Sequence, residues 1–466
     1  MRNLHLAVSG FNPVAAAEPV EPFILHRPAA LGFGRKALLF GLLTASFDVF
    51  LVADIGGFTL RIHQLLLGLA FLSALQLTYE RQLIRFPLGI GWLMLWVTFI
   101  LAFIPHTTYL ARSAGYGFWL LLDVFIIITI VQLFGNRQWI DTLLRGYLSV
   151  FVFVGGFGLL QLLLGVAHLP APFVTQWLIG GIWPRLNGFS YEPSYFSTYM
   201  LMGWVFSGWL VERRIYVLGP VLTRATFIVS TLALILSTSR IGWLMMVVWS
   251  LFYGFRRVRK RHALNVPPVL LVGALLLVAV LAIGAAITST KLQKNIATTF
   301  AGGTGINGTP AHSVDDREKS LEQTWEVFQK SPLVGYSLGG VASAIGAMKG
   351  ARISGNSDAK AMEGGSVFVE VLAASGAVGV IPFILYLVAL IRQPLVAARQ
   401  TDAPTREVLS GLVWALCMEL IILQFNQNVL RAYLWFHIGV LSAAYAAVKL
   451  DEWRAAPRAR HATPAV

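Results

Sequence analysis

The stretch GFWLLLDVFIIITIVQLF, residues 117–134, decides the class of fold. Its only charged residue is Asp123. A helix that crosses a bilayer needs about 20 mostly apolar residues, because all its backbone polar groups must be satisfied within the helix. Similar runs recur along the chain. With 56% hydrophobic residues, 12% charged residues and a mean hydropathy of +0.69, the 466-residue sequence predicts an all-α polytopic membrane protein.

Twelve apolar runs are predicted to span the membrane. They lie at 36–53, 60–77, 86–104, 117–134, 142–166, 193–211, 221–237, 240–255, 266–287, 366–391, 407–425 and 430–449. Residues 221–237 and 240–255 are separated by a stretch so short that they should form a tight hairpin. The predicted organisation is a disordered tail (1–35), spans one to nine (36–287), a large external loop (288–365), spans ten to twelve (366–449) and a second tail (450–466). No cleavable leader is expected at the N-terminus.

Lysine and arginine residues predict the orientation. With both termini in the cytoplasm, 23 of these cations lie on the cytoplasmic side. The short loops on the opposite side hold 5, and the others lie in 288–365, a loop long enough to be translocated largely regardless of its charge. The net charge of +14 is therefore explained by the excess of lysine and arginine on the cytoplasmic side. Anionic membrane lipids are its expected partners, and nucleic acid is not.

Several kinds of chemistry are disfavoured. The single cysteine, Cys417, lies within a predicted span, so neither an intrachain disulfide nor a thiolate metal site is expected. The sequence has no H-E-x-x-H or Walker motif. We therefore expect no metal, nucleotide or other cofactor.

Single arginines stand at the external helix ends, and guanidinium groups suit phosphate oxygens. They are Arg61, Arg112, Arg185, Arg240 and Arg431. For Arg61 and Arg112 the simpler interpretation is favoured, in which the side chain marks a helix end and reaches lipid headgroups. Arg240 closes the STSR hairpin, and Arg431 follows the amide-rich LQFNQN. Both are candidates for holding a phosphate-bearing ligand.

The stretch WPRLNGFSYEPSYFSTYM, residues 183–200, gathers polar groups ahead of a span. Pro193 suits the first position of the helix, and Glu192 before it can either cap the helix or act as a general base. Both roles remain open from the residues alone. Tyr191 and Tyr195 can contact a sugar or anchor the chain at the membrane interface.

Residues 315–340 predict an amphipathic helix over the external mouth, apolar at Leu321, Trp325 and Phe328 and ending at Pro332. Arg317 falls in its first turn.

Four carboxylates, Asp48, Asp123, Glu370 and Glu419, lie in or near predicted spans. Glu370 lies about one turn inside the tenth span and is a second acid/base candidate. Asp48 and Asp123 are expected to pair within the bundle.

Four motifs together resemble the bacterial O-antigen ligase and polymerase superfamily. They are R-x-x-G-F…EPS at 185–194, STSR at 237–240, the run from Arg317 through PLVGYSLGG to Gly340, and FVEVLAASGAVGVIPF at 368–383. The resemblance implies a fold similar to the class C membrane glycosyltransferases, located in the bacterial inner membrane with its active site on the periplasmic face. It also implies metal-independent transfer of a glycan from undecaprenyl diphosphate.

The resemblance implies that Arg185, Arg240 and Arg317 bind the carrier diphosphate, and it makes a chain-length regulator protein a partner. Ligases carry a His-Asn pair at the start of the tenth span, where this chain has Gly365 and Ser366. This departure favours a polymerase of O-antigen or exopolysaccharide. A ligase acting on lipid A-core or protein, and a transporter or flippase of lipid-linked sugars, remain the alternatives.

Overall fold

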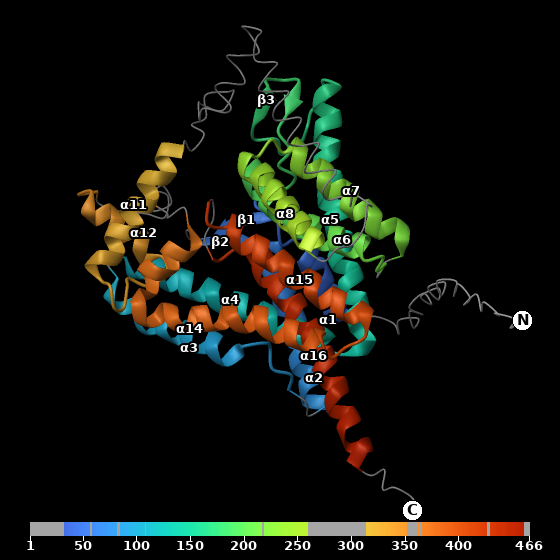
Figure 1. Cartoon of the computed structure of the whole chain (residues 1–466). Coiled ribbons are helices and arrows are strands. Elements are labelled where there is room, and N and C mark those ends of the chain that lie inside the picture. Colours follow the sequence, from blue (N-terminus) through green and yellow to red (C-terminus); the bar gives the residue numbers. More distant parts are fainter. Residues whose placement is uncertain are drawn as a thin grey trace, which may run out of the picture.

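The computed structural model describes residues 32–55, 58–81, 84–107, 109–216, 219–259, 314–351, 362, 366–425 and 429–460. These ranges are mostly helical (Figure 1). The predicted N-terminal tail up to residue 31, the predicted span at 266–287 and the first part of the predicted long loop, residues 288–313, lie outside the described residues.

A helix overlaps each predicted span within the described ranges. The helices are α1 (Phe33–Leu43), α2 (Ile62–Arg81), α3 (Ile90–Ala102), α4 (Leu110–Phe134), α5 (Arg137–Val166), α6 (Pro193–Glu212), α7 (Pro220–Leu236), α8 (Arg240–Arg259), α11 (Val314–Lys330), α12 (Gly340–Met348), α14 (Val367–Ala398), α15 (Ala403–Ile422) and α16 (Ala432–Arg460), with a 3-10 turn at Ile104–His106. Of the described helices, four are long and apolar enough to cross a membrane, namely α2, α4, α5 and α14. The total of twelve spans stays a prediction.

The first predicted span, 36–53, is wrong in its extent. Helix α1 ends at Leu43, and the chain then turns because the backbone amides of Asp48 and Val49 donate to the carbonyl of Phe189. Strand β1 (Val52–Ile55) follows and pairs with β2 (Phe58–Arg61) in an antiparallel hairpin. At the other end of the chain, α16 continues to Arg460, so part of the predicted tail is helical.

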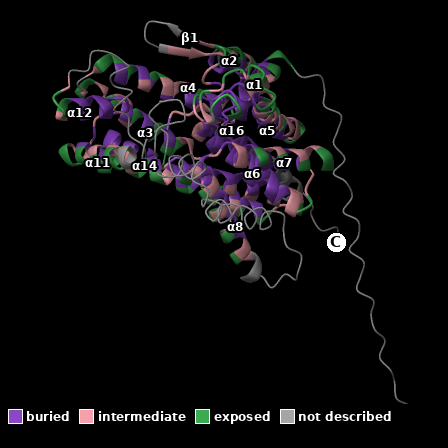
Figure 2. Cartoon of the chain, turned by 90° about the horizontal axis from the view of Figure 1, so that it is seen from above, coloured by how far each residue is buried: buried purple, intermediate pink, exposed green. Residues whose placement is uncertain are grey.

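Helix α6 forms the centre of the structure. Its residues from Phe196 to Leu210 are all buried, and it packs against α5, α7, α8 and α15 (Figure 2). A helix that is apolar on every side belongs in such a position. The N-terminal end of α6, which begins at Pro193 as the sequence predicts, is thereby held firmly.

Helix α14 is broken at Gly376, where the segment after α11 inserts. Gly376 has φ +61°, and a Cβ there would lie 2.3 Å from the carbonyl carbon of Leu333. The amide of Ala377 donates to the carbonyl of Pro332 at 2.8 Å. In return, the amide of Ser337 donates to the carbonyl of Ala374 at 2.7 Å. These bonds satisfy backbone groups that the break would otherwise leave unpaired.

The predicted amphipathic helix is observed as α11, but its packed face differs from the predicted one. Val327 and Thr324 are buried, whereas Leu321 and Trp325 are 42% and 45% exposed. Only Phe328 of the three predicted apolar residues packs on the core. Exposed apolar side chains of this kind are typical of a helix at a membrane interface. Helix α12, which follows Gly339 at φ +77°, was not predicted.

Candidate functional site

Helices α7 and α8 meet in a tight hairpin, as the sequence predicts. The hydroxyl of Ser237 donates to the carbonyl of Leu234 at 2.7 Å, and the amide of Gly242 donates to Oγ of Ser239 at 3.4 Å. Thr238 between them has φ +52°, an uncommon conformation for a β-branched residue. Arg240 is the first residue of α8.

Arg185 joins this hairpin to a second one. Strands β3 (Trp177–Ile179) and β4 (Trp183–Pro184) pair antiparallel beside α5, and Arg185 follows β4. Its Nε and Nη2 donate to Oγ1 and the carbonyl of Thr238 at 2.7 and 3.0 Å. Its Nη1 donates to Oε1 of Gln176 at 2.6 Å. A guanidinium has five N–H donors, so two remain for a ligand.

Charge is concentrated around Arg185. Burial and, to a smaller extent, the nearby Arg240 lower the pKa of its guanidinium to about 10, and Glu192 opposes both. Arg240 and Glu192 therefore each lie within electrostatic reach of Arg185. Two cations with one carboxylate leave a net positive charge, which suits an anion.

Glu192 occupies the N-cap position of α6, but its side chain makes no capping hydrogen bond. Oε2 accepts from the hydroxyl of Ser194 at 3.0 Å instead. The carboxylate is partly exposed. The structure thus shows no hydrogen-bonded side-chain cap, and the role of general base is compatible with this geometry.

Asp48 lies between two arginines. Its carboxylate is 3.5 Å from Nη2 of Arg61 and 3.3 Å from Nη1 of Arg431, which confirms that Asp48 pairs within the bundle. The guanidinium carbon of Arg431 also lies 4.1 Å from the ring centroid of Tyr195, three residues after Glu192. Arg431 is therefore beside the start of α6, and its charge is shared with Asp48.

The other predicted residues are placed as follows. Tyr191 is 58% exposed next to Glu192. Glu370 is buried in the first turn of α14, whose start is held by Gln424, since Oε1 of Gln424 accepts from the amide of Phe368 at 3.0 Å. Arg317 is in the first turn of α11, but its side chain lies outside the described part of the structure.

One interpretation from the sequence is corrected. Arg112 does not reach lipid headgroups: it is 4% exposed, and Nη2 donates to the hydroxyl of Tyr116 at 2.7 Å. Arg61 directly precedes α2, as predicted, and also pairs with Asp48. Asp123 is buried on α4, and no described residue hydrogen-bonds to its Oδ2, so its pairing within the bundle stays a prediction.

Sequence reasoning missed the residues that position the loop before α6. Gln161 on α5 clamps Gly188, accepting from its amide and donating to its carbonyl, both at 2.9 Å. A polar residue inside an apolar span was the available signal for Gln161. Gln176 and Thr238, which hold Arg185, carried no such signal. Across the described ranges, no three His, Cys, Asp or Glu side chains gather as a metal site.

Residues 225–384 match the family model described as O-antigen ligase. This segment confirms the resemblance to the O-antigen ligase and polymerase superfamily. The matching segment contains Arg240, Arg317, the break at Gly376 and Glu370. Arg185 and Glu192 precede it. No curated protein matches the chain. The apolar helices together with this family mark a multi-pass membrane protein.

Proposed function

We propose that the chain is a glycosyltransferase of O-antigen or exopolysaccharide assembly, which joins undecaprenyl-diphosphate-linked repeat units at the periplasmic face of the bacterial inner membrane. The observation that carries the proposal is the arrangement of Arg185, held by Thr238 and Gln176, close to Arg240 and Glu192. It combines fixed cations with a carboxylate at the start of a helix. The match to the O-antigen ligase model supports transfer of a glycan as the reaction class.

In the proposed reaction, a hydroxyl of the incoming repeat unit attacks the anomeric carbon of the growing glycan. The new glycosidic C–O bond forms as the bond to the diphosphate breaks, and undecaprenyl diphosphate leaves with the electron pair. Glu192 accepts the hydroxyl proton. Arg185 and Arg240 stabilise the charge that develops on the diphosphate, so that the reaction needs no metal ion.

The remaining predicted residues take supporting roles in this proposal. Arg317 and Arg431 contribute further positive charge for the diphosphate, Arg431 while it is paired with Asp48. Tyr191 and Tyr195 contact sugar, and Glu370 is a second acid/base group. Anionic lipids and a chain-length regulator protein are the proposed partners beyond the lipid-linked glycan.

A ligase is the second candidate, because the matching model is described as one. Ser366, near the position of the ligase His-Asn pair, donates from its hydroxyl to Oε1 of Gln424 at 3.0 Å. We propose that this serine helps to hold the start of α14 and takes no part in catalysis. The absence of a catalytic His-Asn pair at this position favours the polymerase.

The test is to incubate purified protein in liposomes with carrier-linked repeat units. A ladder of products that is lost in Arg240→Ala but kept in Arg399→Ala, an exposed arginine after α14, would support the polymerase. A single transfer to an added lipid A-core or protein acceptor would support the ligase. Intact repeats that cross the bilayer without any new glycosidic bond would show a transporter and refute both.

A further inference from the structure

A groove opens along α14 because its neighbour α3 is short. Helix α3 has 13 residues and α14 has 32. The two run antiparallel, since Gly89 at the start of α3 approaches Ala389 whereas Phe99 approaches Gly379. The last turns of α14 therefore extend beyond the start of α3. They leave a groove bounded by α16, of about 830 Å³ including the space open to its surroundings.

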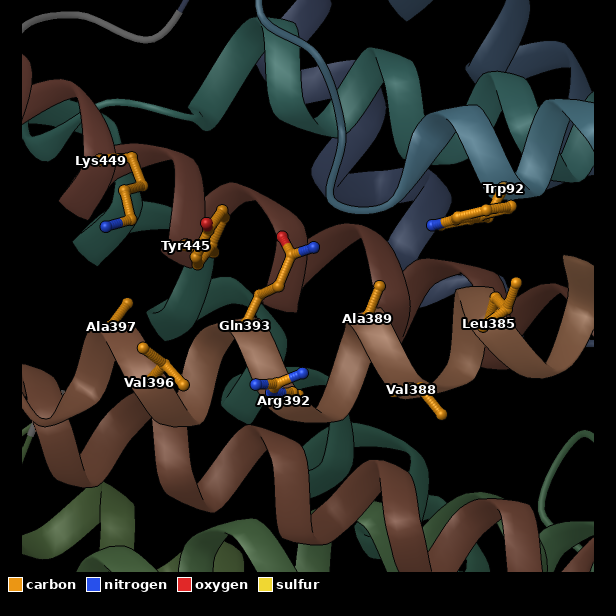
Figure 3. A pocket seen from close by; sticks show the side chains of 10 residues that line it. All are labelled: Trp92, Leu385, Val388, Ala389, Arg392, Gln393, Val396, Ala397, Tyr445 and Lys449. Atoms are coloured by element: carbon orange, nitrogen blue, oxygen red, sulfur yellow. The ribbon is translucent and has the colours of Figure 1, made fainter.

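The groove has its two cations away from Trp92. Lys449 and Tyr445 lie toward one end and Trp92 lies at the other, with Arg392 and Gln393 between them, as Figure 3 shows. Between them, Val388 is 47% exposed. In a membrane protein, an aromatic side chain and a cation beside an exposed apolar wall are typical of a position at the lipid interface.

This groove lies far from the candidate functional site, although α14 and α16 contribute to the groove and begin near candidate site residues. Tyr445 is 14 residues after Arg431 on the same stretch of chain, which corresponds to roughly 20 Å of helix. The groove residues do not take part in the proposed transfer reaction. Its occupant can therefore be tested separately from that reaction.

We propose that the groove binds one anionic phospholipid. Its phosphate contacts Arg392 and Lys449, and an acyl chain lies along Val388 toward Trp92. Charge complementarity favours an anionic headgroup, because the described residues that line the groove include two cations and no carboxylate. The apolar wall favours a ligand with a chain rather than a free phosphate ion, because burying that wall removes apolar surface from water.

The test uses the full-length protein and native mass spectrometry. Phosphatidylglycerol and phosphatidylethanolamine with identical chains are titrated against the wild type, against R392A/K449A and against R399A/R406A. The control variant removes two other cations, near the junction of α14 and α15, that do not line the groove. We expect preferential retention of phosphatidylglycerol by the wild type and the control, and binding about tenfold weaker in R392A/K449A.

A second variant tests the apolar wall without changing charge. Val388→Trp fills the groove from an exposed position, so the core is left intact. It should weaken binding of long-chain phosphatidylglycerol while leaving soluble glycerol phosphate without measurable binding, as in the wild type. Equal retention of the two phospholipids by the wild type would overturn the proposal. So would displacement by inorganic phosphate alone, or stronger retention of a polyprenyl phosphate than of phosphatidylglycerol.

Discussion

Oγ1 of Thr238 accepts a 2.7 Å hydrogen bond from Nε of Arg185, a residue 53 positions earlier in the chain. With the second bond, from Nη2 to the Thr238 carbonyl, it ties the loop before α6 to the hairpin that carries Arg240. Gln176 holds the third nitrogen of the guanidinium. The direction of the remaining donors of Arg185 is therefore set by two residues that do not contact the proposed substrate.

Gln176→Met should lower the affinity for the carrier-linked donor by about tenfold, because one charge-assisted hydrogen bond is lost and the guanidinium is freed to turn. Michaelis constants for the donor measure this effect. Gln76→Met is the matched control, since that glutamine is exposed on α2 and bonds only to Glu80. Equal effects of the two substitutions would contradict a positioning role for Gln176.

Donor binding should fall as the pH rises through about 10, because the pKa of Arg185 is lowered to that value by burial and by Arg240. Its cation, and with it the attraction for diphosphate, is present below that pH and lost above it. Glu192 raises this pKa. Glu192→Gln should therefore move the loss to lower pH. Binding isotherms between about pH 8 and pH 11 test the shift, and a shift in the opposite direction would refute it.

Asp48→Asn should lower the free energy of unfolding by about 1–3 kcal/mol, because Arg61 and Arg431 lose the carboxylate that lies between them. Thermal unfolding in detergent measures the loss. The double variant Asp48→Asn/Arg61→Gln should recover part of it, since one of the two cations that faced the Asp48 carboxylate is removed. No recovery in the double variant would indicate that the loss comes from packing rather than charge.

Gly376→Ala should destabilise the protein by about 2–4 kcal/mol, because φ is +61° and the new Cβ would lie 2.3 Å from the Leu333 carbonyl carbon. Gly156→Ala on α5 is the control, with no atom within 4 Å of the added Cβ. Melting temperatures of the two variants provide the comparison. A Gly376→Ala protein as stable as the control would mean that the loop segment does not insert at the break.

Hydropathy predicts the helices well, because an apolar run in a membrane has few alternatives to a helix. It fails where a tertiary contact ends the run. Helix α1 ends at Leu43 because the following turn bonds to Phe189, far away in the sequence. The packed face of α11 was mispredicted for a related reason. In a membrane protein, apolar residues such as Trp325 can face lipid as well as the core, so periodicity alone does not identify the buried side.

The candidate site was predicted only in part. Arg185, Arg240 and Glu192 were selected by residue type and by proximity to helix ends, and Arg240 and Glu192 both lie within electrostatic reach of Arg185. The contact between Asp48 and Arg431 joins residues 383 positions apart. A single sequence does not show which of several cations such a carboxylate will meet. Thr238 and Gln176 are polar loop residues, and nothing in the sequence around them indicates that they contact Arg185.

The most direct test of the central claim separates binding of the diphosphate from the chemical step. Donor affinity and single-turnover rate should be measured on the same preparations of wild type, Arg240→Ala and Glu192→Gln. We predict that Arg240→Ala loses donor affinity, whereas Glu192→Gln binds the donor with similar affinity near neutral pH and turns over at least about a hundredfold more slowly. Undiminished turnover by Glu192→Gln, together with unchanged donor binding by Arg240→Ala, would contradict the account.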